Sequence, residues 1–150
     1  MKLLAILHSN KRGFTLVELL IVIAILSIMI FGIGGLYGSS QDTAQVEQTR
    51  QEIVQSLRVA HQRAKGKKNS TAHGVNFTLT NFTLYQGTSY ATRDTAYDIT
   101  TQMKGNIEIS GLSGVNFTAG SALPDNPGTV TITSDVQSVY ITVTSLGAVY

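Results

Sequence analysis

The 150-residue chain contains no cysteine, which excludes disulfide bonds and thiolate metal sites. The absence leaves the redox compartment open, because a cysteine-free domain is at home on either side of a membrane. Hydrolytic triads and metal-ligand spacings are missing as well. Of the three histidines, His8 lies near the N-terminus, and His61 and His73 have no paired acids nearby. We therefore expect no enzymatic activity, no metal and no cofactor.

An excess of positive charge is also missing once the N-terminal residues are set aside. The formal net charge of the chain is +2. Three of its 11 Lys and Arg residues lie within residues 1–13, which leaves eight cations against nine acids. The charge of the remaining chain gives no reason to expect nucleic acid as a partner.

The chain does have a long apolar run at residues 14–38, in which Glu18 is the single charged residue. The fourteen Leu, Ile, Val and Phe residues between Leu16 and Leu36 favour membrane insertion by about 4–8 kcal/mol in total. The carboxylate of Glu18 opposes insertion by about 2.5–3.5 kcal/mol at mid-bilayer, so insertion still wins. We predict a transmembrane helix over residues 14–38, in which the acid marks a functional position.

Charges that flank the apolar run predict its orientation. Lys11 and Arg12 precede the run, whereas Asp42 and Glu47 are the first charges after it. The positive-inside rule therefore predicts a cytoplasmic N-terminus, with the chain after residue 40 on the other side. The apolar run also has two ordinary interpretations. It is a secretory signal cleaved near Ser40, in which case the chain is a secreted binding protein, or it is an uncleaved anchor, in which case the chain is a single-pass binding protein.

A more specific interpretation comes from residues 11–18, which read Lys-Arg-Gly-Phe-Thr-Leu-Val-Glu. This segment resembles the signal of type IV pilins and pseudopilins. The resemblance implies that residues 1–13 are a leader, which prepilin peptidase removes by cleavage after Gly13 on the cytoplasmic side. It also implies that Phe14 becomes the N-methylated first residue.

The same resemblance assigns assembly to Glu18, the fifth residue after the cleavage site. In an environment of low dielectric constant, a nearby cation stabilises its carboxylate, and the resemblance implies that the terminal amine of a neighbouring subunit supplies this cation. The alternative is that the side chain is solvated near the lipid headgroups. The implied partners are prepilin peptidase, other pilin or pseudopilin subunits, an assembly platform in the inner membrane, and lipid. The implied location is the cytoplasmic membrane and then a periplasmic or extracellular filament.

A second helical pattern covers residues 39–65, where apolar residues recur along one face. These residues are Val46, Ile53, Leu57, Ala60 and Ala64. We predict one helix from Phe14 to Lys65, ending at Gly66 among several cations. A glycine cluster within it, between Gly32 and Gly38, predicts a weak point in the helix, and the resemblance to pilins implies that it unwinds on assembly. Close helix packing and loose chain are the alternatives.

Beyond residue 70 the pattern changes to short strands rich in Val, Ile and Thr. Strands are expected at 74–79, 82–85, 106–110, 128–134, 138–143 and 146–150. Residues 87–104 and 118–128 are predicted to be loops, in which Asp94 and Asp98 are solvated acids rather than calcium ligands. Gly-Val-Asn-Phe-Thr occurs at 74 and again at 114, too little to establish a repeat. The expected fold is α+β, with the helix of the head, residues 39–150, packed on an antiparallel sheet over 70–150.

This combination of helix and sheet resembles the pilin head. More narrowly, the Arg-x-Ala-x-x-x-x-Lys run that ends the helix, the Gly-Val-x-Phe strand and the C-terminal Gly-Thr-Val-Thr-Ile-Thr resemble the GspH/FimT group of minor pseudopilins and minor pilins. That resemblance implies a minor subunit of a type II secretion pseudopilus or a type IV pilus. A major pilin remains an alternative. A DNA-uptake minor pilin is another, and would use Lys65, Lys67 and Lys68. The uncharged end, Gly147 to Tyr150, departs from the basic ending common in the group.

Overall fold

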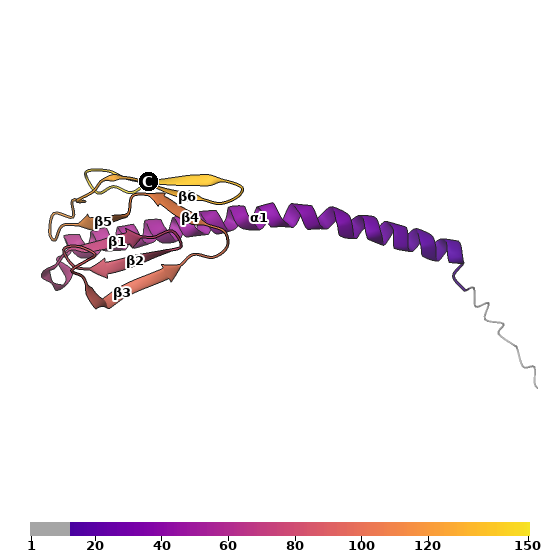
Figure 1. Cartoon of the computed structure of the whole chain (residues 1–150), viewed down its shortest axis with the longest axis horizontal. Helices are drawn as coiled ribbons and strands as arrows, with labels where there is room; N and C mark the ends of the chain where they lie inside the picture. The colour runs from indigo at the N-terminus through magenta and orange to yellow at the C-terminus, as the bar shows by residue number, and fades with distance from the viewer. Residues whose placement is uncertain (1–12) are drawn as a thin grey trace, which may run out of the picture. The chain divides into compact units, whose positions relative to one another are not determined.

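The computed structural model describes residues 13–150, except for the side chains of residues 31–40 (Figure 1). The predicted leader charges Lys11 and Arg12 therefore lie outside the described residues, as do the side chains in the predicted glycine weak point. The chain forms two compact units, Met1–Gly38 and Ser39–Tyr150.

One helix, α1, runs over Leu16–Lys65. It ends where the sequence predicted but begins two residues later than Phe14, because Thr15 caps it. At the C-terminal end of α1, the residue with the left-handed backbone conformation also differs from the expected Gly66. Gly66 still donates its N–H to the carbonyl of Gln62 (2.9 Å), and the left-handed conformation falls on Lys67 (φ 48°). A short 3₁₀ turn, η1 (Lys68–Ser70), follows.

Seven strands form the rest of the head, all paired antiparallel (Figure 1). They are β1 (His73–Phe77), β2 (Asn81–Gln86), β3 (Asp94–Gln102), β4 (Glu108–Gly111), β5 (Gly114–Phe117), β6 (Gly128–Thr133) and β7 (Ser138–Val143). The predicted α+β class, with a helix packed on antiparallel strands, is confirmed.

The prediction of one sheet is wrong, because the strands form two. One has the order β3-β2-β1-β5 and the other the order β4-β6-β7. The chain crosses between them three times, and the shortest of these connections runs from β4 to β5. Gly111 makes this possible with φ 91°, at a place where a Cβ would lie 2.5 Å from the carbonyl oxygen of Thr129.

The two copies of Gly-Val-Asn-Phe, dismissed as a repeat from sequence, are neighbouring strands. They form most of β1 and all of β5, which pair with Val75 opposite Val115 and Gly74 opposite Asn116. Similar residues therefore serve similar positions: each copy places its Val and Phe in the core.

The predicted loop 87–104 is wrong over half of its length, because β3 occupies Asp94–Gln102. No alternating apolar pattern marked this strand, since seven of its nine residues are exposed. Its Thr, Tyr and Ile residues favour extended chain without needing a buried face. The expected final strand at 146–150 is reduced to one isolated bridge, between Val143 and Val149.

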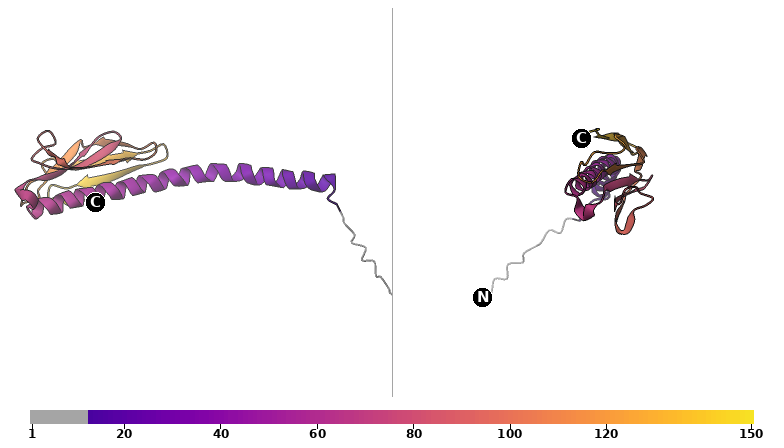
Figure 2. Two further views of the ribbon diagram at one scale, coloured as in Figure 1. Left: turned by 90° about the horizontal axis from the view of Figure 1, so that it is seen from below. Right: turned by 90° about the vertical axis from the view of Figure 1, so that its left-hand side faces the viewer.

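The core of the head confirms the predicted apolar stripe. Val46, Ile53, Leu57, Ala60 and Ala64 are all fully buried. They belong to one cluster with apolar side chains from both sheets, so the helix segment of the head lies against both (Figure 2). Ala60 and Ala64 in this stripe have small side chains, which leave room for the strands to pack against the helix.

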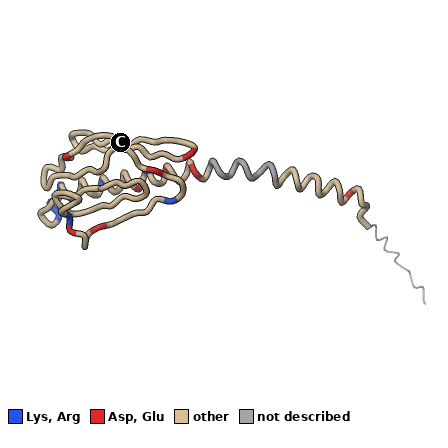
Figure 3. Tube along the Cα trace, viewed as in Figure 1, with Lys and Arg blue, Asp and Glu red and all other residues tan. Residues whose placement is uncertain are grey.

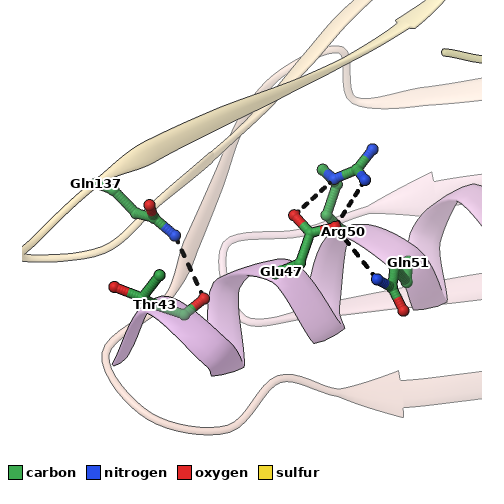
Figure 4. Close-up of polar contacts among 5 residues, drawn as sticks. All are labelled: Thr43, Glu47, Arg50, Gln51 and Gln137. Atoms are coloured by element: carbon green, nitrogen blue, oxygen red, sulfur yellow. Dashed lines mark hydrogen bonds and ion pairs between the residues drawn. The ribbon is translucent and has the colours of Figure 1, made fainter. Parts of the chain in front are cut away.

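Polar contacts tie the start of this helix segment to the second sheet. Gln137, in the turn between β6 and β7, donates its side-chain N–H to the carbonyl of Thr43 (3.3 Å; Figure 4). Nearby, Arg50 forms an ion pair with Glu47 (2.7 Å), and this hydrogen bond lowers the pKa of the Glu47 carboxyl. Both side chains are partly exposed to solvent (32% and 43%), so the pair adds little stability.

Candidate functional site at the start of the long helix

Thr15 organises the beginning of α1. Its Oγ1 accepts a hydrogen bond from the backbone N–H of Glu18 (3.2 Å), and its carbonyl accepts one from Leu19 (3.2 Å). This is the geometry of an N-cap, which satisfies one of the free N–H groups at a helix start. The helix therefore starts immediately after Thr15 and leaves Phe14 outside it.

Gly13 and Phe14 form an open junction before the helix. Both residues are non-helical and exposed, and the Phe14 side chain keeps 82% of its surface accessible. A Cβ added at Gly13 would meet no atom within 4 Å. Within the described residues, the peptide bond between them is free of packing that would block an enzyme.

Glu18 lies in the first turn of α1 and is exposed. It is the one charged residue between Leu16 and Ile30, which Figure 3 shows as an isolated acidic position. A carboxylate in the first turn interacts favourably with the positive end of the helix dipole. No side chain within residues 13–30 or 41–150 donates a hydrogen bond to it, so its acceptor capacity is open to a partner.

The apolar residues after Glu18 are exposed on every side of the helix. Twelve large hydrophobic side chains between Leu16 and Ile30 keep 46–75% of their surface accessible. By contrast, the apolar stripe in the head segment of α1, from Val46 to Ala64, is fully buried.

Within the described part of the chain, no helix has the length and apolar character needed to span a membrane. Residues 31–38 of the predicted transmembrane segment have no described side chains. The predicted span over 14–38 stays a prediction.

Other residues that the sequence suggested as candidates lie in the head, not at the start of α1. Asp98 is held by Arg93 (2.8 Å), whose guanidinium also lies 3.8 Å from the ring centroid of Tyr90. Asp94 accepts a hydrogen bond from the backbone N–H of Ala96 (3.1 Å). The two acids are thus engaged separately, not gathered around a common point.

The cations proposed for nucleic-acid contact lie at the end of α1. Lys65, Lys67 and Lys68 are exposed around a tight turn in which Lys67, Asn69 and Ser70 all have positive φ. Their position agrees with stabilisation of the helix C-terminus, where positive charge meets the negative end of the dipole.

Comparison with protein families matches residues 8–34 to the prokaryotic N-terminal methylation motif. The matched segment contains Gly13, Phe14 and Glu18, and it is a type IV pilin-like signal. Neither the comparison with curated proteins nor the comparison with solved structures gave a match.

Sequence reasoning identified Gly13, Phe14 and Glu18 but missed Thr15. The signal for it was present, since Thr-x-x-Glu directly before an apolar run is the pattern of a capping box. The structure contains the Thr15 half of that arrangement. Glu18 thus combines two properties, a place in the cap and an exposed carboxylate.

Proposed function

We propose that this chain is the precursor of a filament subunit, a GspH/FimT-like minor pseudopilin or minor pilin. Prepilin peptidase cleaves it after Gly13, Phe14 is N-methylated, and the mature chain joins a type II secretion pseudopilus or a type IV pilus. The observation that carries the proposal is the methylation motif at residues 8–34, with its exposed Gly13–Phe14 junction.

Assembly follows from the chemistry of the new N-terminus. Cleavage creates a cationic amine on Phe14, four residues before the carboxylate of Glu18. Within one chain the helix cap separates the two groups along the axis, so Glu18 retains its acceptor capacity. In the apolar centre of a filament, an unpaired carboxylate is costly, and the amine of an adjacent subunit neutralises it. The pairing therefore sets the axial register between subunits.

Before assembly, the apolar residues between Leu16 and Ile30 require lipid. The precursor is accordingly placed in the cytoplasmic membrane with its head on the outer side, where an assembly platform transfers it to the filament. The α+β head supports this role, because it is a folded body with a buried core of its own.

The decisive experiment is mass spectrometry of the mature protein's N-terminus, from cells that express prepilin peptidase. We expect a chain that begins at Phe14 and carries one methyl group, and the intact precursor when the peptidase is absent. A mature chain that begins near Ser40, or one that keeps Met1, would favour a secreted or anchored binding protein instead.

The role of Glu18 is tested separately by Glu18→Ala. The variant should still enter the membrane and be cleaved, but it should be lost from purified filaments. Ser27→Ala is the matched control, because Ser27 is an exposed polar residue of the same helix whose hydroxyl bonds only to the carbonyl of Ile23. Normal incorporation of Glu18→Ala would contradict the assigned role. The abundance of the chain in filaments distinguishes a minor from a major subunit.

A further inference from the structure

Two strands of the head have a free edge, β3 in the first sheet and β7 in the second. Within residues 13–150, β3 pairs only with β2 (Figure 1). β7 pairs with β6 and, from Thr142 onward, with residues 148–150 on its outer side. Natural proteins usually cover such edges or protect them with proline or lysine, and neither strand contains either residue. Both edges are therefore open to another strand.

The two edges run in opposite directions along the head segment of α1. β3 ends beside the start of that segment, where Lys104 lines the same pocket as Gln45. β7 begins at this end instead, since Gln137 bonds to Thr43, and the residues that follow β7 line a pocket with His61. β3 is thus antiparallel to the helix, and β7 is parallel to it. In two heads that point the same way, the β3 edge of one and the β7 edge of the other have the directions of an antiparallel pair.

The hydrogen bonds of β3 show which of its backbone groups are free. Met103 donates its N–H to the carbonyl of Thr80 on the β2 side (3.0 Å). Because the bonding side alternates along an antiparallel strand, Thr100 and Gln102 direct their N–H and C=O groups to the open side. The register with β2 is regular over Ile99–Gln102 and shifts before Ile99. The usable edge of β3 is therefore four residues long.

The usable edge of β7 has the same length. Thr142 exchanges two hydrogen bonds with Tyr150 on the outer side (3.2 and 3.1 Å). By the same alternation, Tyr140 and Ser138 also direct their backbone groups outward, where no other described residue pairs with them. Residues 148–150 cover the edge from Thr142 onward, which leaves Ser138–Ile141 free.

We propose that copies of this chain associate head to tail, with Thr100 and Gln102 of one copy paired with Tyr140 and Ser138 of the next. Each pair exchanges two backbone hydrogen bonds, and both pairs form together in this register alone. The contact is heterologous, because two different edges meet, and such contacts repeat along a filament. It rests on the proposed function, since the subunits of a filament that leaves one membrane have heads pointing the same way.

The side chains around the joint agree with this register. Lys104 lies two residues beyond β3, and Asp135 lies three residues before β7. Both are exposed and outside the ion pairs of the described chain, and the register brings them together across the joint. On the face toward the helices, Ile99 is 51% exposed beside a groove of about 430 Å³. It comes to lie opposite Ile141 and diagonal to Val139 of the next copy, which cover part of its exposed surface.

The absence of cysteine makes cross-linking a clean test. The full-length chain with both Thr100→Cys and Tyr140→Cys is expressed in cells that assemble the filament, and purified filaments are treated with a mild oxidant. The Cα atoms of such a pair lie about 5.5 Å apart, within the range of a disulfide. We expect a ladder of dimers, trimers and higher multiples, because each copy contributes a different cysteine to each of its two neighbours.

Three controls accompany the double variant. Thr100→Cys alone and Tyr140→Cys alone should stay monomeric, because a head-to-tail contact places neither residue beside its own counterpart. Leu79→Cys combined with Tyr140→Cys should also give no ladder. Leu79 is 65% exposed, but it lies between β1 and β2, away from the β3 edge.

Two further changes in the double-cysteine chain test the charges and the backbone pairing. Lys104→Glu should lower the yield of the ladder about two- to fivefold, as expected for an exposed ion pair, and Asp135→Lys added to it should restore the yield. Gln102→Pro should remove most of the ladder, because it deletes an N–H on the open side and leaves the bonds to β2 intact.

The contact is refuted if a control gives as much ladder as the double variant, or if Lys104→Glu or Gln102→Pro leaves the yield unchanged. Adducts whose mass is not a multiple of the chain's mass refute it as well, because another protein would then occupy the edge. Filaments that contain the chain but give no ladder refute this contact and leave the proposed function intact. Absence of the chain from filaments would instead overturn the proposed function, and with it the requirement that the heads point the same way.

Discussion

Replacing Gly74 by Ala should destabilise the head through steric overlap alone. A Cβ at this position would lie 2.5 Å from the hydroxyl oxygen and 2.6 Å from Cζ of Tyr85, and 2.7 Å from the carbonyl oxygen of Val115. Gly74 does not have a positive φ, so alanine adds no backbone strain. The cost comes from displacing Tyr85, which is 4% exposed and packs edge-to-face on Tyr90.

Overpacking of this kind costs typically about 1–3 kcal/mol. For a head of this size that corresponds to a fall of roughly 4–12 °C in the unfolding midpoint. Gly114→Ala is the matched control, because Gly114 is the same residue in the second Gly-Val-Asn-Phe copy. Its Cβ would approach the carbonyl oxygen of Val75 to 3.0 Å, with its next contacts at 3.3–3.4 Å, so a smaller loss is expected.

Thermal unfolding followed by circular dichroism, on the full chain in detergent, measures both losses. Tyr85→Leu in the Gly74→Ala background should recover part of the stability, because it removes the ring atoms nearest to the new methyl group. A Gly74→Ala variant as stable as the parent would refute the reasoning, as would a larger loss for Gly114→Ala.

Three further predictions concern other parts of the head. Burial lowers the pKa of His73 below its ordinary value of 6.5, so below that pH the unfolded chain binds a proton that the folded chain binds poorly. The unfolding free energy should therefore fall as the pH drops through 6.5, and His73→Gln should flatten that slope in denaturant titrations. Lys67→Gly should raise the unfolding free energy by about 0.5–1 kcal/mol, because glycine adopts the positive φ of this turn without strain; a lower midpoint would contradict this. Arg93→Ala should lower the unfolding free energy more than Arg50→Ala does in the same assay, because it leaves the mostly buried Asp98 unpaired, whereas the Arg50–Glu47 ion pair is more exposed.

The parts of the head with a buried face could be predicted from sequence. The apolar stripe from Val46 to Ala64 specified the helix and its packing side, and alternating Val, Ile and Thr residues located β6 and β7. In each case the buried face requires apolar residues at a regular spacing in the sequence. β3 has no such spacing, because an edge strand exposed on both faces does not need alternating apolar and polar residues.

The division into two sheets depends on contacts that no local pattern encodes. Gly111 is one of several glycines in the chain, and only the close approach of the Thr129 carbonyl shows why glycine is required there. The pairing of β1 with β5 is similar, since identical residues do not reveal that two segments are neighbours. The end of the helix at Lys65 was predicted correctly, but the left-handed conformation expected at Gly66 falls on Lys67.

The candidate site was more accessible to sequence reasoning than the fold, because its chemistry is local. Gly13, Phe14 and Glu18 lie within six residues, and their spacing alone carries the resemblance that the family comparison then matched. The signal motif did not identify Thr15, the residue that caps the helix. The structure adds the physical reason for the helix start, and it leaves the junction before the helix non-helical and accessible.

The contrast between the two parts of α1 shows why the N-terminal part needs another environment. The stripe from Val46 to Ala64 is fully covered by the head, whereas the large apolar side chains between Leu16 and Ile30 are about half exposed or more. Covering them is worth on the order of 10 kcal/mol or more, so water is not their final surroundings. Lipid and neighbouring helices both provide that cover, and their difference lies at Glu18. Under the proposed function, lipid leaves its carboxylate without a cation, while the N-terminal amine of a neighbouring subunit provides one. A single acid in an otherwise apolar helix would then make assembly more favourable than residence in lipid, and Glu18→Ala would remove this preference.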